Sequence, residues 1–316
     1  MLKIRLLGTG EARYRNRPLA SFPNHQYHRL FCYLLLNRSH PHHRERLAAV
    51  FWGEHSTSAS RQYLRNALWR LRNALQADGV PVEQYLLINE ENVSVLTSDE
   101  LWLDIDHFET IISRYQDIAG QQLTPPEAAQ LEKAVDLYGG DLLEGVYEDW
   151  CLYDRERLHI LHLNALGKLV AFHEHNGTYE CGLTYGQRIL ALDPTREKVH
   201  RQLMRLYWQL NEPGEALAQY KCCVQALRQE LGTSPITRTK RLYQQIIHHQ
   251  FNPASWLLQL DDRSPDFSET DESAKALVKH ALQELHRLHA KAEETCTELE
   301  RVEHLISQVL ATVNRT

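Results

Sequence analysis

Apolar and polar residues partly alternate at the start of the chain, over residues 2–7 (Leu-Lys-Ile-Arg-Leu-Leu), as in a strand with one buried face. Gly8 and Gly10 interrupt this pattern. The segment 16–18, Asn-Arg-Pro, is typical of a turn and leads into a second short apolar stretch. The pattern therefore predicts a small antiparallel sheet over residues 2–22.

Three helical patterns follow the predicted sheet. Apolar residues recur at intervals of three and four positions, which is the spacing of one helix face. They predict a first helix over 25–36, a short second helix over 44–51 and a third over 61–76. The polar segment 37–43 is expected to connect the first two.

The third helix has the clearest pattern of this region. It follows a loop over 52–59, and either Ser58 or Ser60 could cap its start. Four leucines at alternating steps of four and three lie on one face: Leu64, Leu68, Leu71 and Leu75. We expect this leucine face to be buried and the opposite face to meet solvent or a partner.

The opposite face of the third helix is rich in arginine and side-chain amides, and no acidic residue occurs between positions 55 and 77. Arginine binds guanine, and Asn or Gln binds adenine, by paired hydrogen bonds at the base edges, whereas flanking arginines contact phosphates. This composition favours a helix that enters the major groove of DNA, with adenine contacts from its amides; a solvated basic helix remains the alternative. The candidate DNA-contacting residues are Arg61, Gln62, Arg65, Asn66, Trp69, Arg70, Arg72 and Asn73.

A β-hairpin is predicted after the third helix, because two strand-like segments, 85–88 and 93–96, flank a polar stretch of four residues. Strands, three helices and a hairpin in this order make up a winged helix-turn-helix. The predicted wing contains Glu90 and Glu91 and no basic residue in its loop, so the sequence gives no support for a wing contact to phosphate.

Several motifs of this region resemble the winged-helix domain of antibiotic-regulatory-protein (SARP-type) bacterial activators. They are Leu6-Leu7-Gly8, Phe51-Trp52 and the run 64–72, Leu-Arg-Asn-Ala-Leu-Trp-Arg-Leu-Arg. The segment 102–108, Trp-Leu-Asp-Ile-Asp-His-Phe, resembles the junction that follows that domain. The resemblance implies binding to double-stranded DNA and contact with RNA polymerase through the loop at 53–59.

Residues 104–250 are almost wholly helix-patterned. The segment 124–127, Thr-Pro-Pro-Glu, contains the residues of a helix start with a capping box. The pair Gly182-Leu183 recurs as Ala216-Leu217 after 34 residues, which is the period of tetratricopeptide units. Small residues at these positions fit places where paired helices approach closely.

This middle part of the chain resembles the bacterial transcriptional activator domain (BTAD). The matching stretches are 138–143 (Tyr-Gly-Gly-Asp-Leu-Leu), 149–150 (Asp-Trp), 156–158 (Glu-Arg-Leu) and 230–235 (Glu-Leu-Gly-Thr-Ser-Pro). Together with the winged-helix motifs, the resemblance covers about residues 1–250 in the order of the family. It implies a helical repeat that contacts the DNA-binding domain, itself or other proteins, and a purely scaffolding role stays open.

The C-terminal part begins with an acidic, polar stretch, 261–273, which predicts a linker. Residues 274–316 contain no Gly or Pro, and their apolar positions alternate by steps of four and three, as in a coiled-coil heptad. We expect a homodimer through this helix, in preference to folding back or binding another protein. The candidate dimerisation residues are Leu285, Leu288, Leu299, Val302, Ile306 and Val309.

Charge is distributed unevenly along the chain. Residues 1–77 contain 13 lysines and arginines against three acids, a net charge of +10, whereas the remainder contains 22 against 38, a net charge of −16. A basic N-terminal region on an acidic body indicates that this region binds a polyanion. The mean hydropathy of −0.48 and the absence of a long apolar run predict neither a membrane span nor a secretory signal, so a cytoplasmic protein is expected.

No catalytic or cofactor motif stands out in the sequence. It contains neither a P-loop nor H-E-x-x-H nor a glycine-rich dinucleotide loop. The histidines of the segment 40–43 and the pair His159 and His162 lack further ligands at metal-binding spacing. Cys222 and Cys223 are expected to be buried thiols of a repeat helix. We therefore predict no cofactor, no metal and no enzymatic activity.

The sequence thus predicts a mostly α-helical chain of four parts. These are a winged-helix DNA-binding domain (1–100), a tetratricopeptide-like BTAD (101–250), a linker (251–273) and a coiled-coil helix (274–316). The predicted function is that of a sequence-specific DNA-binding transcriptional regulator, and the SARP resemblance implies an activator. The alternative is a non-enzymatic adaptor whose winged helix and repeats bind protein partners.

Overall fold

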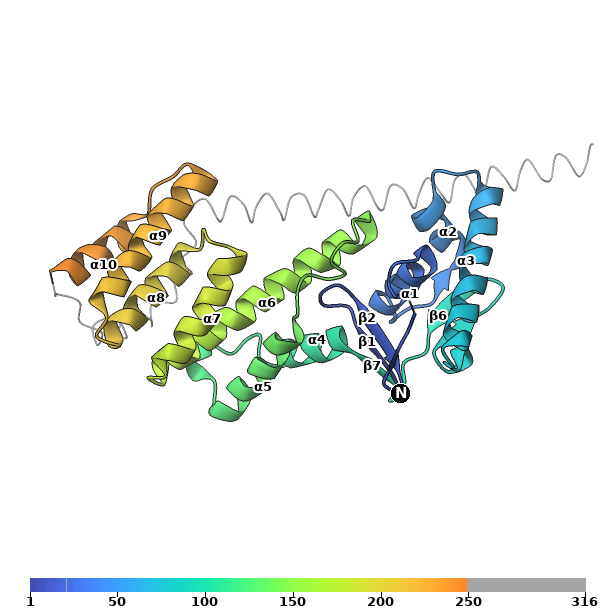
Figure 1. The fold of residues 1–316 in the computed structure, drawn as a ribbon, viewed down its shortest axis with the longest axis horizontal. Coiled ribbons are helices and arrows are strands. Elements are labelled where there is room, and N and C mark those ends of the chain that lie inside the picture. The colour runs from blue at the N-terminus through green and yellow to red at the C-terminus, as the bar shows by residue number, and fades with distance from the viewer. Residues whose placement is uncertain (21, 249–316) are drawn as a thin grey trace, which may run out of the picture. The chain divides into compact units, whose positions relative to one another are not determined.

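The computed structural model describes residues 1–20 and 22–248 of the 316-residue chain (Figure 1). Met1–Phe251 forms one compact unit, and the second unit, Asn252–Thr316, falls outside the described residues. The predicted linker and coiled coil, with all six candidate dimerisation residues, therefore also lie outside the described part. Within that part, the fold is mostly helical with two small N-terminal sheets, which confirms the predicted fold class for these residues.

The first sheet has four strands in the order β3-β2-β1-β7. As predicted, β1 (Leu2–Arg5) and β2 (Glu11–Tyr14) are antiparallel, and β3 (Arg17–Pro18) continues the meander. The fourth strand, β7 (Leu101–Leu103), joins β1 in parallel register from within the predicted junction. Leu2 and Ile4 of β1 are buried, so one face of this sheet packs on the core.

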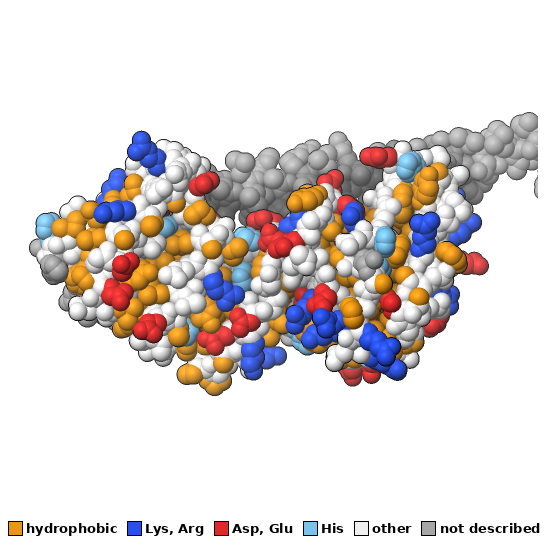
Figure 2. Space-filling model, viewed as in Figure 1, with side chains coloured by type: hydrophobic (Ala, Val, Ile, Leu, Met, Phe, Trp, Pro, Cys, Tyr) orange, Lys and Arg blue, Asp and Glu red, His pale blue; other side chains and the backbone are white. Residues whose placement is uncertain are grey.

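Three helices and a second sheet complete the winged helix. The helices are α1 (Gln26–Leu36), α2 (Arg44–Trp52) and α3 (Thr57–Ala77), and the sheet has the order β4-β6-β5, with β4 at His42–His43, β5 at Leu86–Ile88 and β6 at Asn92–Val95. The predicted hairpin is therefore present. In the same view, Lys and Arg side chains are prominent over this part of the molecule (Figure 2), in agreement with the charge asymmetry of the sequence.

The start of α3 differs from the prediction. The helix begins at Thr57 with Ser56 as its N-cap residue, and α2 extends to Trp52, so the loop expected over 52–59 is reduced to residues 53–56. Ser60 therefore does not cap the start of α3. Its buried hydroxyl instead donates a hydrogen bond to the backbone oxygen of Trp52 at 2.7 Å. The first turn, Thr-Ser-Ala-Ser, has no apolar periodicity, which is why the leucine pattern missed it.

Each of the remaining described α-helices packs against the next one along the chain. They are α4 (Asp104–Arg114), α5 (Pro125–Leu137), α6 (Asp149–His175), α7 (Tyr179–Leu192), α8 (Glu197–Gln209), α9 (Pro213–Leu231) and α10 (Thr237–Ile247). The capping box at the start of α5 is present, with the Thr124 N–H donating to the Glu127 carboxylate at 2.8 Å. None of the described helices is long and apolar enough to cross a membrane.

The repeat pattern corresponds to close helix packing. A side chain carbon added to Gly182 of α7 would lie 3.0 Å from Cδ1 of Leu206 in α8. Ala216, at the equivalent position of α9, is fully buried. The two small residues therefore lie at close approaches of helices, as predicted from their 34-residue spacing.

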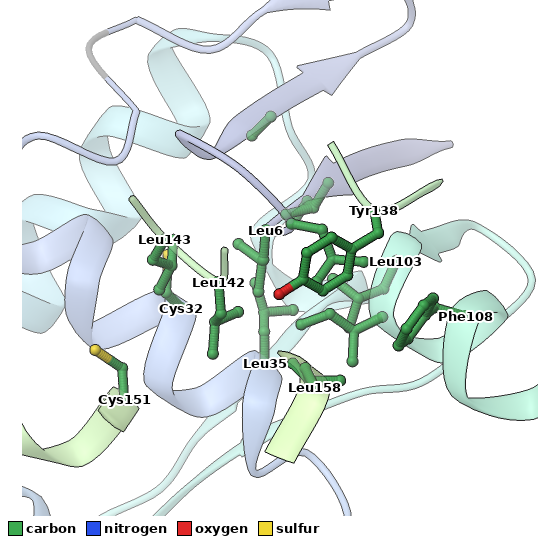
Figure 3. Close-up of a cluster of buried hydrophobic side chains, with 14 of the residues drawn as sticks. Leu6, Cys32, Leu35, Leu103, Phe108, Tyr138, Leu142, Leu143, Cys151 and Leu158 are labelled. Atoms are coloured by element: carbon green, nitrogen blue, oxygen red, sulfur yellow. The ribbon is translucent and has the colours of Figure 1, made fainter. Parts of the chain in front are cut away.

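The helical region is joined to the winged helix through the segment between α5 and α6. The Leu143 N–H donates to the Leu6 oxygen at 2.8 Å, and the Gly8 N–H donates to the Asp141 oxygen at 2.9 Å. Gly8 has a φ of +112°, a conformation that favours glycine at this crossing. Figure 3 shows the buried cluster at this junction, where Leu6 and Leu35 lie among side chains of the helical region such as Leu142.

Candidate nucleic-acid interface

α3 is held in place by its leucine face. Leu64, Leu68, Leu71 and Leu75 are all buried, and the helix packs against both α1 and α2. Because this stripe fixes the rotation of the helix about its axis, the opposite stripe must face outward. The burial of all four leucines confirms the predicted helix orientation.

The eight candidate DNA-contacting residues all lie on the exposed part of α3. Trp69 is the most conspicuous, because 64% of this large side chain is accessible to solvent. An exposed indole is apolar surface that a partner can cover. The structure thus brings the predicted set together on one helix surface: Arg61, Gln62, Arg65, Asn66, Trp69, Arg70, Arg72 and Asn73.

Two of the arginines already have ionic partners within the fold. Arg61 Nε lies 2.8 Å from a carboxylate oxygen of Glu45 in α2. Arg72 Nη2 lies 2.5 Å from the carboxylate of Glu83, and a hydrogen bond from the backbone of Glu83 together with this guanidinium holds the pKa of Glu83 below its usual value. These pairs are exposed, so an anion can compete for both arginines.

Arg65 and Arg70 form no ion pair with any other residue that the structure describes, so their guanidinium groups are the free cations of α3. On the same helix, the Gln62 amide donates a hydrogen bond to the Asn66 side-chain oxygen at 3.3 Å. This bond orients two amides toward solvent while leaving further donors and acceptors available. The combination of free guanidinium groups and oriented amides suits recognition of base edges.

The wing has a different electrostatic character. Glu90 and Glu91 are exposed at the turn between β5 and β6, as the sequence indicates. Arg44, at the start of α2, donates a hydrogen bond from its guanidinium to the backbone oxygen of Asn89 at 3.0 Å and so links α2 to the turn of the wing. The wing loop itself therefore offers carboxylates and no cation.

The winged helix has a second basic surface, which the sequence pattern did not predict. The outer face of the first sheet presents Lys3, Arg5 and Arg13, with Arg15 in the turn after β2 and Arg17 in β3. The alternation Leu-Lys-Ile-Arg, which predicted the buried face of β1, also contains the signal for this basic outer face.

The histidines and cysteines singled out in the sequence have structural surroundings. His42 Nε2 lies 2.8 Å from the backbone oxygen of Asn37, and the ring of His162 is stacked on Tyr138. Cys223 is buried, and this burial raises its thiol pKa to about 12, whereas Cys222 is exposed, contrary to expectation. No group of three or more His, Cys, Asp or Glu side chains in the described residues is arranged to hold a metal ion.

The fold and this surface define a class: a winged-helix protein with an exposed basic helix, followed by a tetratricopeptide-like helical domain. The family model for the bacterial transcriptional activator domain matches residues 103–247. This match runs from the last residue of β7 to the end of α10. This match confirms, over residues 103–247, the resemblance to the bacterial transcriptional activator domain that the motifs indicate.

Two curated relatives extend the similarity into the winged helix. The regulatory protein AfsR of Streptomyces coelicolor is 26% identical over 261 residues, which cover 80% of this chain and 25% of the relative. The regulatory protein AfsR of Streptomyces griseus is 23% identical over 246 residues, covering 78% and 24%. The chain spans about a quarter of the length of these relatives. Both are named as regulatory proteins.

A solved structure has the same fold. Mycobacterium tuberculosis EmbR, in complex with a low-affinity phosphopeptide, superimposes with a TM-score of 0.60 at 19% sequence identity. The superposition covers 84% of this chain and 72% of that chain. The shared fold therefore includes both the winged helix and the helical domain.

Proposed function

We propose that the protein is a sequence-specific DNA-binding transcriptional regulator whose α3 reads the major groove of double-stranded DNA. The observation that carries this proposal is the composition of the exposed face of α3. That face combines free guanidinium groups, paired amides and an exposed indole, and it includes no acidic side chain. The regulatory names of its relatives agree with this proposal.

The residues have separate roles in this proposal. Arg65 and Arg70 bind guanine edges or phosphates, while Gln62, Asn66 and Asn73 bind adenine. Phosphate contacts supply affinity and a salt dependence, and base-edge contacts supply sequence preference. Arg61 and Arg72 exchange their present carboxylate partners for phosphates, since exposed ion pairs are weak.

The regulator acts as an activator and contacts RNA polymerase through residues 53–59, as the SARP resemblance implies. In the structure these residues form the turn after α2 and the first turn of α3, and Gly53–Ser58 are exposed. The predicted C-terminal coiled coil would make the full chain a homodimer and would place two reading helices on repeated half-sites. The protein has no enzymatic role in this proposal.

Fluorescence anisotropy of the full chain tests the proposal. The protein is titrated onto the DNA upstream of its own coding sequence and onto scrambled DNA, across a salt series. We expect preference for the upstream DNA and a steep salt dependence, both lost in the Arg65→Ala/Arg70→Ala variant. The matched control is Arg228→Ala/Arg241→Ala, which removes the same charge from exposed positions of α9 and α10.

Equal or negligible binding to both DNAs would contradict the proposal. The basic surface would then bind protein, and the chain would be a non-enzymatic adaptor. Loss of binding in the control variant as well as in the α3 variant would show that only net charge matters and would exclude α3 as the reading element.

A further inference from the structure

The indole of Trp69 is a large apolar surface on the outer side of α3, and 64% of this side chain is accessible to solvent. Tyr63, on the same helix, is also partly exposed, but its ring lies 5.1 Å from that of His55 and 6.4 Å from that of Trp52. Trp69 has no such ring contact and no hydrogen bond with any residue that the structure describes. The fold therefore packs the ring of Tyr63 and leaves the indole of Trp69 uncovered.

The surroundings of Trp69 distinguish it from an ordinary exposed apolar residue. Single apolar side chains are common on protein surfaces, so exposure alone indicates no site. On a helix, the positions three and four residues away are the nearest neighbours at the surface. For Trp69 all four of these neighbours are arginines or asparagines, namely Arg65, Asn66, Arg72 and Asn73. The uncovered indole is thus enclosed by side chains that the proposed function assigns to DNA.

Duplex DNA offers such an indole one kind of apolar partner. The faces of the bases are stacked on one another, and the phosphates are charged, so neither suits an apolar ring that enters the major groove. The C5 methyl of thymine, in contrast, projects into that groove beside the hydrogen-bonding groups of the base edges. Covering one methyl group changes affinity by about fourfold, because the apolar surface is removed from water.

The helix geometry places Trp69 next to the amides that are proposed to bind adenine. Around the helix axis, Trp69 lies roughly 60° from Asn66 and roughly 40° from Asn73. Along the axis it lies roughly 4.5 Å from Asn66 and roughly 6 Å from Asn73, which corresponds to about one or two base-pair steps. The indole and the two amides can therefore meet neighbouring base pairs of the same groove.

We propose that Trp69 determines sequence preference by covering the C5 methyl of a thymine, about one or two base pairs from an adenine bound by Asn66 or Asn73. This inference rests on the proposed function, because it assigns a particular base contact to the helix that reads the major groove. The group recognised is a C5-methylated pyrimidine in duplex DNA. The same indole therefore also favours 5-methylcytosine over cytosine at that position.

Removal of single methyl groups from the DNA tests this contact. A duplex is selected from random-sequence DNA with the full chain, and each thymine of the selected site is replaced in turn by deoxyuridine, which still pairs with adenine and lacks only the methyl. We expect affinity to fall by about fourfold at one or two positions and to stay unchanged at the others. A site that is insensitive to every one of these replacements would overturn the inference.

Variants of the full chain assign the methyl contact to Trp69. Trp69→Ala should bind the thymine and deoxyuridine duplexes equally, because the surface that covers the methyl is gone. Trp69→Phe keeps an apolar ring without the indole N–H, so it should retain a preference for thymine. Tyr153→Ala removes a similarly exposed aromatic ring, 69% accessible, from α6 and should respond to deoxyuridine as the unsubstituted protein does. A methyl effect that persists in Trp69→Ala, or disappears in Tyr153→Ala, would contradict the assignment.

A second base and a direct proximity measurement complete the test. When the sensitive thymine is replaced by cytosine, adding a C5 methyl to that cytosine should raise affinity in the unsubstituted protein and leave Trp69→Ala unaffected. Iodine at C5 of deoxyuridine takes the place of the methyl, and light then joins the base to an aromatic ring in contact with it. The crosslinked peptide should contain Trp69, and a crosslink to another residue alone would overturn the inference.

The outcomes for this inference and for the proposed function differ. If the chain selects a site, and the Arg65→Ala/Arg70→Ala variant loses it, the proposed function stands whatever the deoxyuridine duplexes show. Insensitivity to the C5 methyl in that case overturns only the role of Trp69. A chain that selects no site overturns both.

Discussion

The carboxylate of Asp104 accepts hydrogen bonds from the backbone N–H of Leu6 at 3.0 and 2.9 Å, across 98 residues of sequence. It also accepts one from the N–H of Leu7 at 2.9 Å. Asp104 is the first residue of α4 and is 1% exposed. Its carboxylate therefore satisfies two buried N–H groups at the end of β1 and ties the start of the BTAD to the winged helix.

The first prediction concerns this contact. Asp104→Ala would leave the N–H groups of Leu6 and Leu7 buried without acceptors, each at about 1–3 kcal/mol, so we expect a loss of about 3 kcal/mol in the free energy of unfolding. Asp104→Asn keeps one acceptor oxygen and should lose less. Urea unfolding of the full chain measures both, with the exposed Asp99→Ala as control. A loss no larger than that of the control would show that water replaces the carboxylate.

His162 makes stability depend on pH. Burial of its imidazole, together with repulsion from Arg188 and His159, lowers the pKa of His162 to about 4. The ring is stacked on Tyr138 at 4.0 Å between centroids, and its Nδ1 has no hydrogen-bond partner among the described residues. The folded state thus favours the neutral imidazole, while the unfolded state takes up a proton near pH 6.5.

The sign of the effect follows from this lowered pKa. The stability that depends on a neutral His162 is fully present above about pH 6.5, and about 3 kcal/mol of it is lost by the time the pH has fallen to 4. His162→Phe keeps an aromatic ring against Tyr138 and removes the titration. Between pH 6.5 and 4, the free energy of unfolding of this variant should fall less steeply than that of the unsubstituted protein, and parallel curves for the two would contradict the assignment.

A third prediction concerns base recognition by the amides of α3. Sites selected from random DNA should contain A·T pairs at the positions that Gln62, Asn66 and Asn73 reach. Asn66→Ala should reduce discrimination at its position by about 1–3 kcal/mol, roughly 5- to 150-fold, because the paired hydrogen bonds to adenine are lost. Gln76→Ala removes an exposed amide of the same helix outside the candidate set and should leave the selected site unchanged. Selected sites without A·T pairs would exclude this role.

The sequence pattern predicted the orientation of α3, but it did not predict the contacts that surround this helix. The four leucines defined both the buried face and, by exclusion, the outward position of Trp69. Local periodicity cannot predict β7, because a three-residue strand contains too little alternation and pairs with β1 residues that lie 99 positions away in the sequence. For the same reason, the partners of Arg61 and Arg72 depend on how α2 and the segment after α3 pack, which no residue spacing encodes.

The last prediction separates DNA binding from activation. Glu54 and Ser58 are exposed between α2 and the early part of α3, and the structure gives neither side chain a hydrogen bond to a described residue. Glu54→Ala/Ser58→Ala should leave DNA affinity unchanged, because both residues lie outside the candidate reading set. In a reconstituted transcription reaction with purified RNA polymerase, the same variant should activate several-fold less, because a contact to polymerase is removed. Ser98→Ala/Asp99→Ala changes the same kinds of residue at exposed positions beyond the wing and should activate normally. Full activation by the first variant would place the polymerase contact elsewhere on the chain.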